Sequence, residues 1–444
     1  MKWLLGFMLL MSSLAYAQHN NRSGRDLQFR FGNPGARSLA FGGAFIGLAD
    51  DATAPVANPA GATRTTKRSM AFELNYNQID NNIPFAAGHI QQVNLFEFDY
   101  QFSDRKAEES FFQIPYLAVV VPKDKWRLGF FLHQQANFSR AYENEEVTYC
   151  LIASNGYPDC LGLGAESFPA STELLELKIL NGGVSVAREV TDKISLGLSV
   201  FYSQMDYQAD SNLYAPQASY DATVYRFARG DDSSLGLIAG GLWQATRELS
   251  LGVTYKRQPK FDYTASLESS RPVPNTPEDF SSPAIFKIPD SLGFGINISP
   301  MDQLSINIDA NRVYYSQITD ELVDFAQLEV NNSTLLQTMA DITEIHMGLE
   351  WVYLGLANPL SLRVGYWLDP YHAPVNNVED SQILYGPRTD PTVRDVFFLH
   401  LFEQNENHYS LGFGYTFGQK FQLDMAVQAA DSSRDATISG IYRF

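Results

Sequence analysis

Residues 409–417 read Tyr-Ser-Leu-Gly-Phe-Gly-Tyr-Thr-Phe, so that every second residue is large and apolar and the residues between are small or polar. After a turn at residues 418–420, the alternation returns in residues 421–429 and again in residues 436–444. Runs of about ten residues with this period are typical of strands that cross a membrane in a β-barrel. In a bilayer the apolar face of such a strand contacts lipid, and the small polar face lines the lumen.

The same alternation occurs upstream, at residues 194–200, 292–298, 304–309 and 345–351. The connections alternate between short and long, as expected when one barrel end has tight periplasmic turns and the other has long extracellular loops. Short turns are expected near residues 122–125, 190–193, 246–248, 299–303, 354–359 and 418–420. Long polar connections are expected near residues 138–172, 208–222, 264–283, 316–340 and 369–406.

Counting strands back from the C-terminus gives an even number, about fourteen, with a first strand near Met70–Ile79. The aromatic stretch 93–102 would break this parity, so we place it at or above the extracellular rim. The turn near residues 354–359 sets Glu350 opposite Arg363 on the inward face, although a slip of one residue would reverse the faces. Two unrelated surface charges are the alternative for this pair.

Composition narrows the class of protein. The net charge of −18 argues against nucleic acid as a partner, because phosphates attract basic patches. The chain has 23 Tyr and 30 Phe but a mean hydropathy of only −0.18, which suits a polar-lined barrel with aromatic belts and also many secreted β-sandwiches. We assign Trp126, Trp243 and Trp351, beside short turns, to the periplasmic belt. Cys150 and Cys160 favour a disulfide in an exported chain, with free thiols as the alternative.

The first 17 residues have the features of a secretory signal peptide. Lys2 provides the positive charge, residues 3–14 are largely apolar, and Ala15-Tyr16-Ala17 places small residues at the cleavage positions. The apolar run is too short for a membrane-spanning helix, which needs about 20 residues. We therefore expect a signal peptide at residues 1–17 and a single barrel unit at residues 67–444.

Residues 18–66 lack the alternation and are expected to form a hatch, or plug, inside the lumen. Ala40, Phe41, Ala44, Phe45 and Leu48 would form one apolar stripe on a helix. Glycines cost about 1 kcal/mol each in a free helix, but they allow a backbone to pack closely inside a narrow barrel. The expected hatch and gating residues are listed together here: Gly42, Gly43, Phe45, Asp50, Asp51, Asn58 and Pro59. Of these, the two aspartates are expected to anchor the hatch to lumenal Arg or Lys.

Residues 35–52, followed by Asn58-Pro59-Ala60-Gly61, resemble the N-terminal hatch of the FadL-type long-chain fatty-acid transporter family. Residues 288–295 and 302–309 are similar to a late hairpin of that family, and residues 442–444 resemble the C-terminal signature of outer-membrane barrels. The resemblance implies an all-β, transmembrane antiparallel barrel of about fourteen strands with a hatch. It also implies passive uptake of a hydrophobic small molecule, long-chain fatty acids by default, by a Gram-negative outer-membrane protein in contact with lipid and expected to be a monomer.

Similar N-terminal patterns occur in relatives that serve secretion or surface attachment, so an accessory barrel that binds a protein partner is the alternative. Motifs for catalysis are absent: the seven His are scattered, and the chain has no metal-spaced Cys/His cluster, nucleophile elbow or phosphate-binding loop. We expect no enzyme activity, no cofactor and no metal, with a lipid-hydrolysing barrel as a further alternative because its catalytic groups need not be close in sequence.

The ligand is expected to contact apolar residues that face a wet loop or lumen. The candidates are Phe397, Phe398 and Leu401, in the apolar run 396–402 of the last long connection. A strand tucked under neighbouring loops is the alternative for this run. Trp367 is expected to face inward near the extracellular end, either as a ligand contact or as an aromatic filler.

Overall fold

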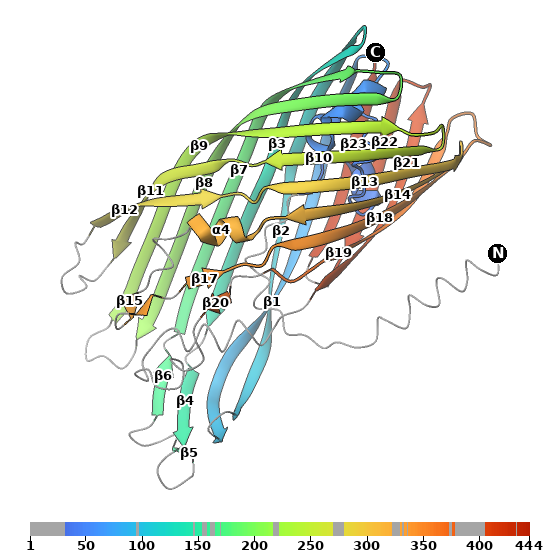
Figure 1. The fold of residues 1–444 in the computed structure, drawn as a ribbon. Helices are drawn as coiled ribbons and strands as arrows, with labels where there is room; N and C mark the ends of the chain where they lie inside the picture. Colours follow the sequence, from blue (N-terminus) through green and yellow to red (C-terminus); the bar gives the residue numbers. More distant parts are fainter. Residues whose placement is uncertain are drawn as a thin grey trace.

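The computed structural model describes residues 32–94, 97–144, 147–152, 158–159, 165–168, 170–215, 222–269, 279–321, 329–330, 333–334, 336–372, 375–377, 405–431 and 433–444. Within these residues, fourteen antiparallel strands form a closed barrel (Figure 1). They are β1 (Ser69–Asn94), β2 (Glu97–Lys123), β3 (Trp126–Asn144), β7 (Ala170–Glu189), β8 (Ile194–Ala215), β9 (Ala222–Gln244), β10 (Leu249–Arg257), β13 (Ser291–Met301), β14 (Leu304–Val313), β18 (Ile342–Tyr353), β19 (Leu360–Asp369), β21 (Glu406–Phe417), β22 (Phe421–Ala429) and β23 (Ser433–Arg443). The barrel closes where β23 pairs with β1, from Ser69 opposite Arg443 to Ile79 opposite Ser433.

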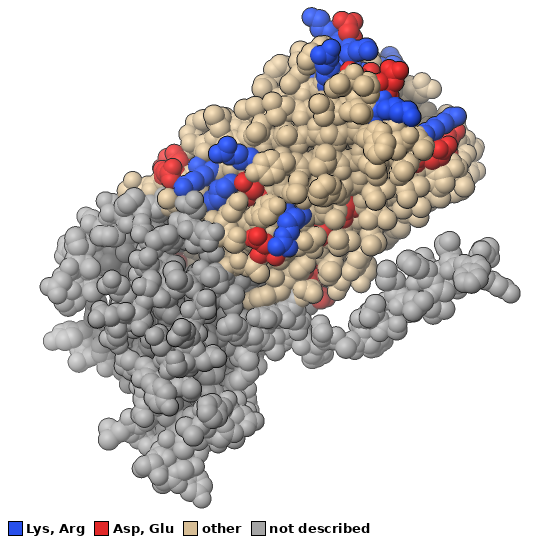
Figure 2. All heavy atoms as spheres, viewed as in Figure 1, with Lys and Arg blue, Asp and Glu red and all other residues tan. Residues whose placement is uncertain are grey.

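The wall turns its apolar side outward, as the alternation predicted. On β8, Leu196 and Leu198 are 54% and 40% exposed, whereas Ser195 and Ser199, which alternate with them, are buried. A water-soluble sheet would bury the leucines, so this pattern is that of a wall surrounded by lipid. Figure 2 shows a band of the wall without charged side chains between charged groups near the short turns and others nearer the long connections. Among the described residues, no helix has both the length and the apolar character needed to cross a membrane.

All the predicted short turns lie at one end of the barrel, and the long connections lie at the other (Figure 1). The aromatic stretch 93–102 falls at the far end of the β1–β2 hairpin, where Asn94 pairs with Glu97. Because β1 pairs with β23 only up to Ile79, this hairpin continues beyond the wall and adds no barrel strand. The prediction for this stretch and the strand count are therefore confirmed.

The wall is interrupted at two prolines. β10 ends before Gln258-Pro259 and β11 (Lys260–Ser269) follows, while β12 (Asp279–Lys287) is separated from β13 by Ile288-Pro289-Asp290. Proline cannot donate a ladder hydrogen bond, which explains a break at these sites. The β11–β12 hairpin pairs with residues 226–229 near the beginning of β9, and α4 (Ser316–Glu321) contacts β12. The long connections hold further short strands: β4 (Val147–Ile152), β5 (Pro158–Asp159), β6 (Ala165–Phe168), β15 (Glu329–Val330), β16 (Ser333–Thr334), β17 (Leu336–Thr338) and β20 (Val375–Asn377).

Residues 34–65, which we call the lumenal segment, lie inside the barrel in its short-turn half (Figure 1). The segment contains α2 (Ala36–Ala40), α3 (Ala54–Ala57) and the 3-10 helix η2 (Pro59–Arg64), and nearly all of its residues are buried. The predicted helical stripe from residue 40 to residue 48 is wrong as a helix, because α2 ends at Ala40 and turns follow. The residues of the stripe are nevertheless all buried, since the turns also direct them into contact with the wall.

Candidate gate and lumenal cavity

The lumenal segment contacts the wall through a belt of inward-facing glycines. At each of them an added Cβ would overlap with atoms of the segment, so a larger residue would push the two apart. The belt consists of Gly197 and Gly240 against residues 58–60, Gly252 and Gly295 against residues 46–47, Gly348 and Gly365 against residues 41–42, and Gly412 against Ala40. Gly197 pairs with Gly240, and Gly348 with Gly365, on neighbouring strands. The small residues on the inward faces of the strands, from which the sequence predicted a lumen, are therefore also the surface on which the lumenal segment packs.

Gly42 and Gly43, two of the predicted gating residues, form the sharp turn after α2. Their φ angles are +63° and +85°, values that residues with a Cβ rarely adopt. A Cβ on Gly42 would lie 2.7 Å from the backbone nitrogen of Tyr366, and one on Gly43 would lie 2.9 Å from Nδ1 of His346. Backbone geometry and close approach thus both require glycine here.

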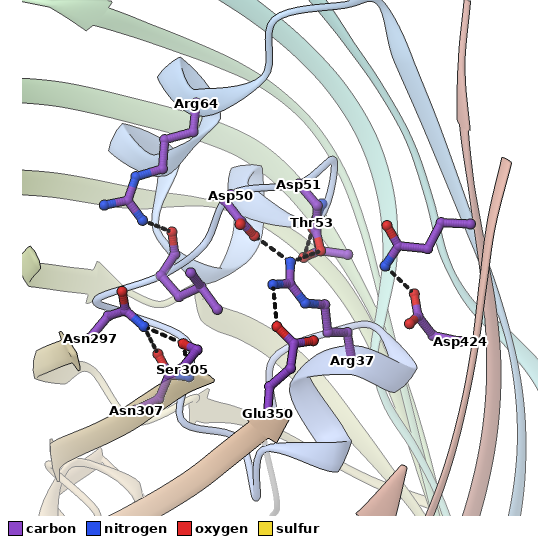
Figure 3. Close-up of polar contacts among 12 residues, drawn as sticks. Arg37, Asp50, Asp51, Thr53, Arg64, Asn297, Ser305, Asn307, Glu350 and Asp424 are labelled. Carbon is purple, nitrogen blue, oxygen red and sulfur yellow. Dashed lines mark hydrogen bonds and ion pairs between the residues drawn. The ribbon is translucent and has the colours of Figure 1, made fainter. Parts of the chain in front are cut away.

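An ionic network joins the lumenal segment to the wall, and we call its residues the arginine cluster; Figure 3 shows Arg37 with Asp50 and Glu350 at its centre. Its members are Arg37, Asp50, Asp51, Glu350, Arg363 and Asp424. Arg37, on α2, pairs with Asp50 and lies 3.7 Å from Asp51 and 3.4 Å from Glu350. Arg363 donates hydrogen bonds to Glu350 at 2.6 Å and to Asp424 at 2.7 Å. The predicted Glu350–Arg363 register is confirmed.

The cation that holds Asp50 and Asp51 differs from the expected one. It is Arg37, a residue of the lumenal segment itself, and the wall contributes the acidic Glu350 in return. Burial raises the pKa of Asp51 from its usual value of 3.8 even though Arg37 opposes the shift. Asp51 Oδ1 also accepts hydrogen bonds from the backbone and the hydroxyl of Thr53 at 2.8 Å and 2.5 Å.

Asp309, on β14, is a second anchor that the sequence did not reveal. Its carboxylate accepts hydrogen bonds from the backbone nitrogens of Phe45 at 2.6 Å and Ile46 at 2.7 Å. These residues follow the glycine turn, so the carboxylate fixes the middle of the predicted gating stretch. A pair of adjacent backbone N–H groups and a short lumenal side chain are not recognisable as partners in sequence.

Asn58 and Pro59, the last two predicted gating residues, lie at the start of η2. The Asn58 side chain donates to the backbone oxygens of Ile46 at 2.9 Å and Gly241 at 3.3 Å, and it accepts from the nitrogen of Ala60. It therefore caps the helix and ties the segment to β9. Pro59 occupies the first helical position, where the missing N–H costs no hydrogen bond.

A cavity of about 320 Å³ lies on the long-connection side of the lumenal segment. Gly42, Gly43 and Ile46 form part of its lining, together with Gln135 and Lys256 of the wall. Many of the wall residues that line it carry amides, hydroxyls or charged groups, so the lining is mixed polar and apolar. The candidates Phe397, Phe398 and Leu401 lie outside the described residues, as do Cys160 and the predicted signal peptide, so the disulfide with Cys150 stays a prediction.

Trp367 faces inward and lines this cavity, as expected. Its ring stacks between two histidines, 5.2 Å from His346 and 3.9 Å from His408 between centroids. Its Nε1–H donates to Gln428 at 3.1 Å. The three belt tryptophans Trp126, Trp243 and Trp351 are 44–48% exposed on the outer face beside the short turns.

The inner face of the wall also carries an apolar cluster that the alternation did not predict. It consists of Leu177, Ile179, Met205, Phe261, Tyr263 and Ile288. An unbroken alternation would place Phe261 and Tyr263 on the lipid side with Tyr255, but the break at Pro259 shifts the rhythm by one residue and turns them inward. Ala136 packs against the cluster and also lines the cavity, so the two are continuous.

A closed antiparallel barrel with a lipid-facing wall and its own N-terminal segment in the lumen defines a class of outer-membrane transport protein. The family model described as "Outer membrane protein transport protein (OMPP1/FadL/TodX)" matches residues 165–439, more than half of the chain. The chain belongs to this family, and it is located in the outer membrane of Gram-negative bacteria. Family members are transporters or channels.

Several solved structures have a similar fold at low sequence identity. A FadL homologue of Pseudomonas aeruginosa is 15% identical with a TM-score of 0.59, covering 90% of this chain and 96% of its own. The Ralstonia pickettii toluene transporter TbuX is 17% identical with a TM-score of 0.58, covering 94% of this chain and 100% of its own. The CymD monoaromatic hydrocarbon channel is 16% identical with a TM-score of 0.58, over 94% and 99%. No curated protein sequence matches the chain.

Proposed function

We propose that this protein is a passive outer-membrane uptake channel for small hydrophobic molecules, gated by residues 42–51 of the lumenal segment. The observation that carries the proposal is the cavity above the glycine turn, which is continuous with the inward apolar cluster. A ligand entering from the long-connection end would reach this cavity and meet Gly42, Gly43 and Ile46 as its floor. Displacing that floor would open the lumen toward the short turns.

Several polar contacts hold the gating stretch, and those to charged groups are the strongest. Asp309 accepts two hydrogen bonds in its middle, and the Arg37–Glu350 contact holds the helix before it. Hydrogen bonds to charged groups contribute about 1.5–3 kcal/mol each, so releasing the stretch costs several kcal/mol. A ligand can shift this equilibrium only by binding better to the open state than to the closed one. The apolar cluster beside the floor provides a surface on which such a difference can arise.

Long-chain fatty acids are the default ligand because of the resemblance of the N-terminal segment to the FadL hatch. Compact aromatic compounds are the second ligand class, because two of the similar structures are named for toluene and monoaromatic hydrocarbons. A cavity of about 150 Å³ is enough to bind benzene in an apolar setting, so the volume here suits either a compact ligand or one segment of a longer chain.

Matched phenylalanine variants test the route. Phe261→Ala removes an inward ring of the apolar cluster, whereas Phe294→Ala removes a ring that is 56% exposed on the lipid side. Cells producing each variant at equal folded levels would be assayed for uptake of radiolabelled oleate and of toluene. We expect Phe261→Ala to lower uptake of the true ligand at least tenfold and Phe294→Ala to leave it unchanged. Wild-type uptake of both probes at the level of cells without the protein would overturn the proposal.

A further inference from the structure

The extracellular ends of β19 and β21 bring two carboxylates and an imidazole together inside the lumen. Asp369 and Glu406 are direct partners in the register of these strands, and His408 lies two residues further along β21 on the same face. One ligand atom from each of the three residues lies within 4.8 Å of those of the other two. All three are at most 1% exposed. We call them the histidine cluster.

Within the described residues, the buried carboxylate of Asp369 has no permanently charged partner. Neither of its carboxylate oxygens accepts a hydrogen bond, and no Lys or Arg of the described chain lies within ion-pair distance of it. The Nδ1 atom of His372 is 3.4 Å away, but Nδ1 is 2.8 Å from the backbone oxygen of Pro370, to which it can donate. Like charges directly opposite on two strands destabilise a sheet, and burial increases the penalty.

We propose that Asp369, Glu406 and His408 bind a divalent first-row transition-metal ion, for which Zn²⁺ is the best match. One imidazole and two carboxylates form a donor set that such ions accept, with metal–ligand bonds of about 2.0–2.2 Å. Bonds of that length place neighbouring donor atoms roughly 3–3.5 Å apart. The His408 Nε2 and Glu406 Oε2 atoms are 3.6 Å apart, so a small contraction suffices.

Ligation through Nε2 requires the proton of His408 on Nδ1, and Gln428 lies beside that atom. The amide nitrogen Nε2 of Gln428 is 3.4 Å from His408 Nδ1, and the amide oxygen accepts the Trp367 indole N–H. A half-turn of the amide about its last side-chain bond would exchange the two atoms and bring the oxygen beside Nδ1, where it can accept the proton. Gln428 is thus positioned as the outer partner that orients a metal-bound imidazole.

The bound metal would join the two ends of the connection formed by residues 370–405. It would also fix the His408 ring, which stacks on Trp367 at 3.9 Å with an interplanar angle of 14°. Since Trp367 lines the cavity, the metal site stiffens the outer mouth of the lumen. This inference is independent of the uptake proposal, because it needs only the barrel and these side chains.

Metal binding is tested on the full chain purified in detergent with a tag other than polyhistidine. The protein is treated with a chelator, desalted, and titrated with ZnCl₂ by calorimetry, and retained zinc is measured by mass spectrometry. We expect one Zn²⁺ per chain, and at least tenfold weaker binding in Asp369→Asn and in His408→Gln. His133→Gln removes another buried lumenal histidine and should bind as the wild type does. Co²⁺ in place of Zn²⁺ should give visible absorption bands only when the three ligands are present.

Thermal unfolding provides a second readout, because the difference in unfolding temperature between the wild type and Asp369→Asn should change sign when zinc is added. Zn²⁺ should raise the unfolding temperature of the wild type and raise that of Asp369→Asn less at the same zinc concentration. Without metal, Asp369→Asn should unfold at a higher temperature than the wild type, because it removes one of two opposed carboxylates. Absence of retained zinc in the wild type, or equal zinc affinity in Asp369→Asn and the wild type, would overturn the metal site and assign a shared proton to the carboxylate pair instead.

Discussion

The arginine cluster and the histidine cluster both place buried carboxylates on the inner face of the wall, and β19 contributes to each through Arg363 and Asp369. In the arginine cluster every carboxylate lies within ion-pair distance of a guanidinium. In the histidine cluster Asp369 has only an imidazole at that distance among the described residues. A guanidinium is permanently charged, so the arginine cluster contains its own counter-charges. It therefore serves to hold the lumenal segment on the wall. In the histidine cluster, the buried Asp369 carboxylate lacks such a counter-charge among the described residues, which is why we propose that a cation from solution binds there.

The largest effect is expected from Arg363→Met in the arginine cluster. This change leaves Glu350 and Asp424 buried without their guanidinium, and breaking a buried pair from one side costs about 3–5 kcal/mol. Urea unfolding of the barrel in detergent, followed by tryptophan fluorescence, measures the loss. If Arg363→Met and Asp369→Asn changed the metal-free stability in the same direction and by similar amounts, the proposed difference between the arginine cluster and the histidine cluster would be wrong.

Arg37→Met tests whether the same cluster holds the lumenal segment in place. The variant loses the contacts to Asp50, Asp51 and Glu350 but leaves the Arg363 pairs of the wall intact. We expect a smaller loss of stability, about 2–3 kcal/mol, and a marked rise in single-channel conductance in planar bilayers. Asp369→Asn, which does not touch the segment, is the control and should leave conductance unchanged when all recordings are made in the presence of a chelator. A closed Arg37→Met channel would mean that the glycine belt, Asp309 and Asn58 retain the segment without Arg37.

Gly365→Val tests the glycine belt directly. Its side chain would overlap with the backbone of Phe41 and Gly42, and overpacking of this kind costs about 1–3 kcal/mol. Gly182→Val is the matched control, because a Cβ there meets only a side-chain carbon of Leu132 at 3.5 Å. Conductance should rise for Gly365→Val and stay at the wild-type level for Gly182→Val. Equal conductance of the two variants would show that the segment does not depend on the belt.

The two clusters also show how far sequence alone could reach. The register of Glu350 and Arg363 was predictable because a short turn at residues 354–359 joins their strands, and a short turn fixes which residues are opposite. Asp369 and Glu406 are also direct partners, but the connection of residues 370–405 between them sets no register. The alternation gives the face of each residue and not its partner across a long loop. For that reason the sequence predicted no metal ligands.

The other differences between the predictions and the structure occur where the two-residue alternation is interrupted or absent. The strand count and the outward apolar face follow from the two-residue period, which is a local property of each strand. Phe261 and Tyr263 were not predicted as lumenal because the shift at Pro259 reverses the faces beyond it. Arg37 was not predicted as the partner of Asp50 because the lumenal segment has no period, and its contacts depend on turns at Gly42 and Gly43.

Asp51→Asn is expected to have the smallest effect, because Asp51 is the member of the arginine cluster that most resembles Asp369. Its guanidinium partner is 3.7 Å away, and burial raises its pKa above the usual 3.8. The folded protein therefore holds the Asp51 proton more tightly than the unfolded chain does. This contribution to stability is present at low pH and is lost as the pH rises through the raised pKa.

At pH 7, where the ionised carboxylate is unfavourable, Asp51→Asn should change the unfolding free energy by less than about 1 kcal/mol. The asparagine oxygen can still accept the hydrogen bonds from Thr53. As the pH falls toward 4, the wild type should gain stability relative to the variant, and comparing the two chains cancels the titration of the other carboxylates. If Asp51→Asn instead lost as much unfolding free energy at pH 7 as Arg37→Met, the negative charge of Asp51 would be needed for stability, as that of Glu350 is.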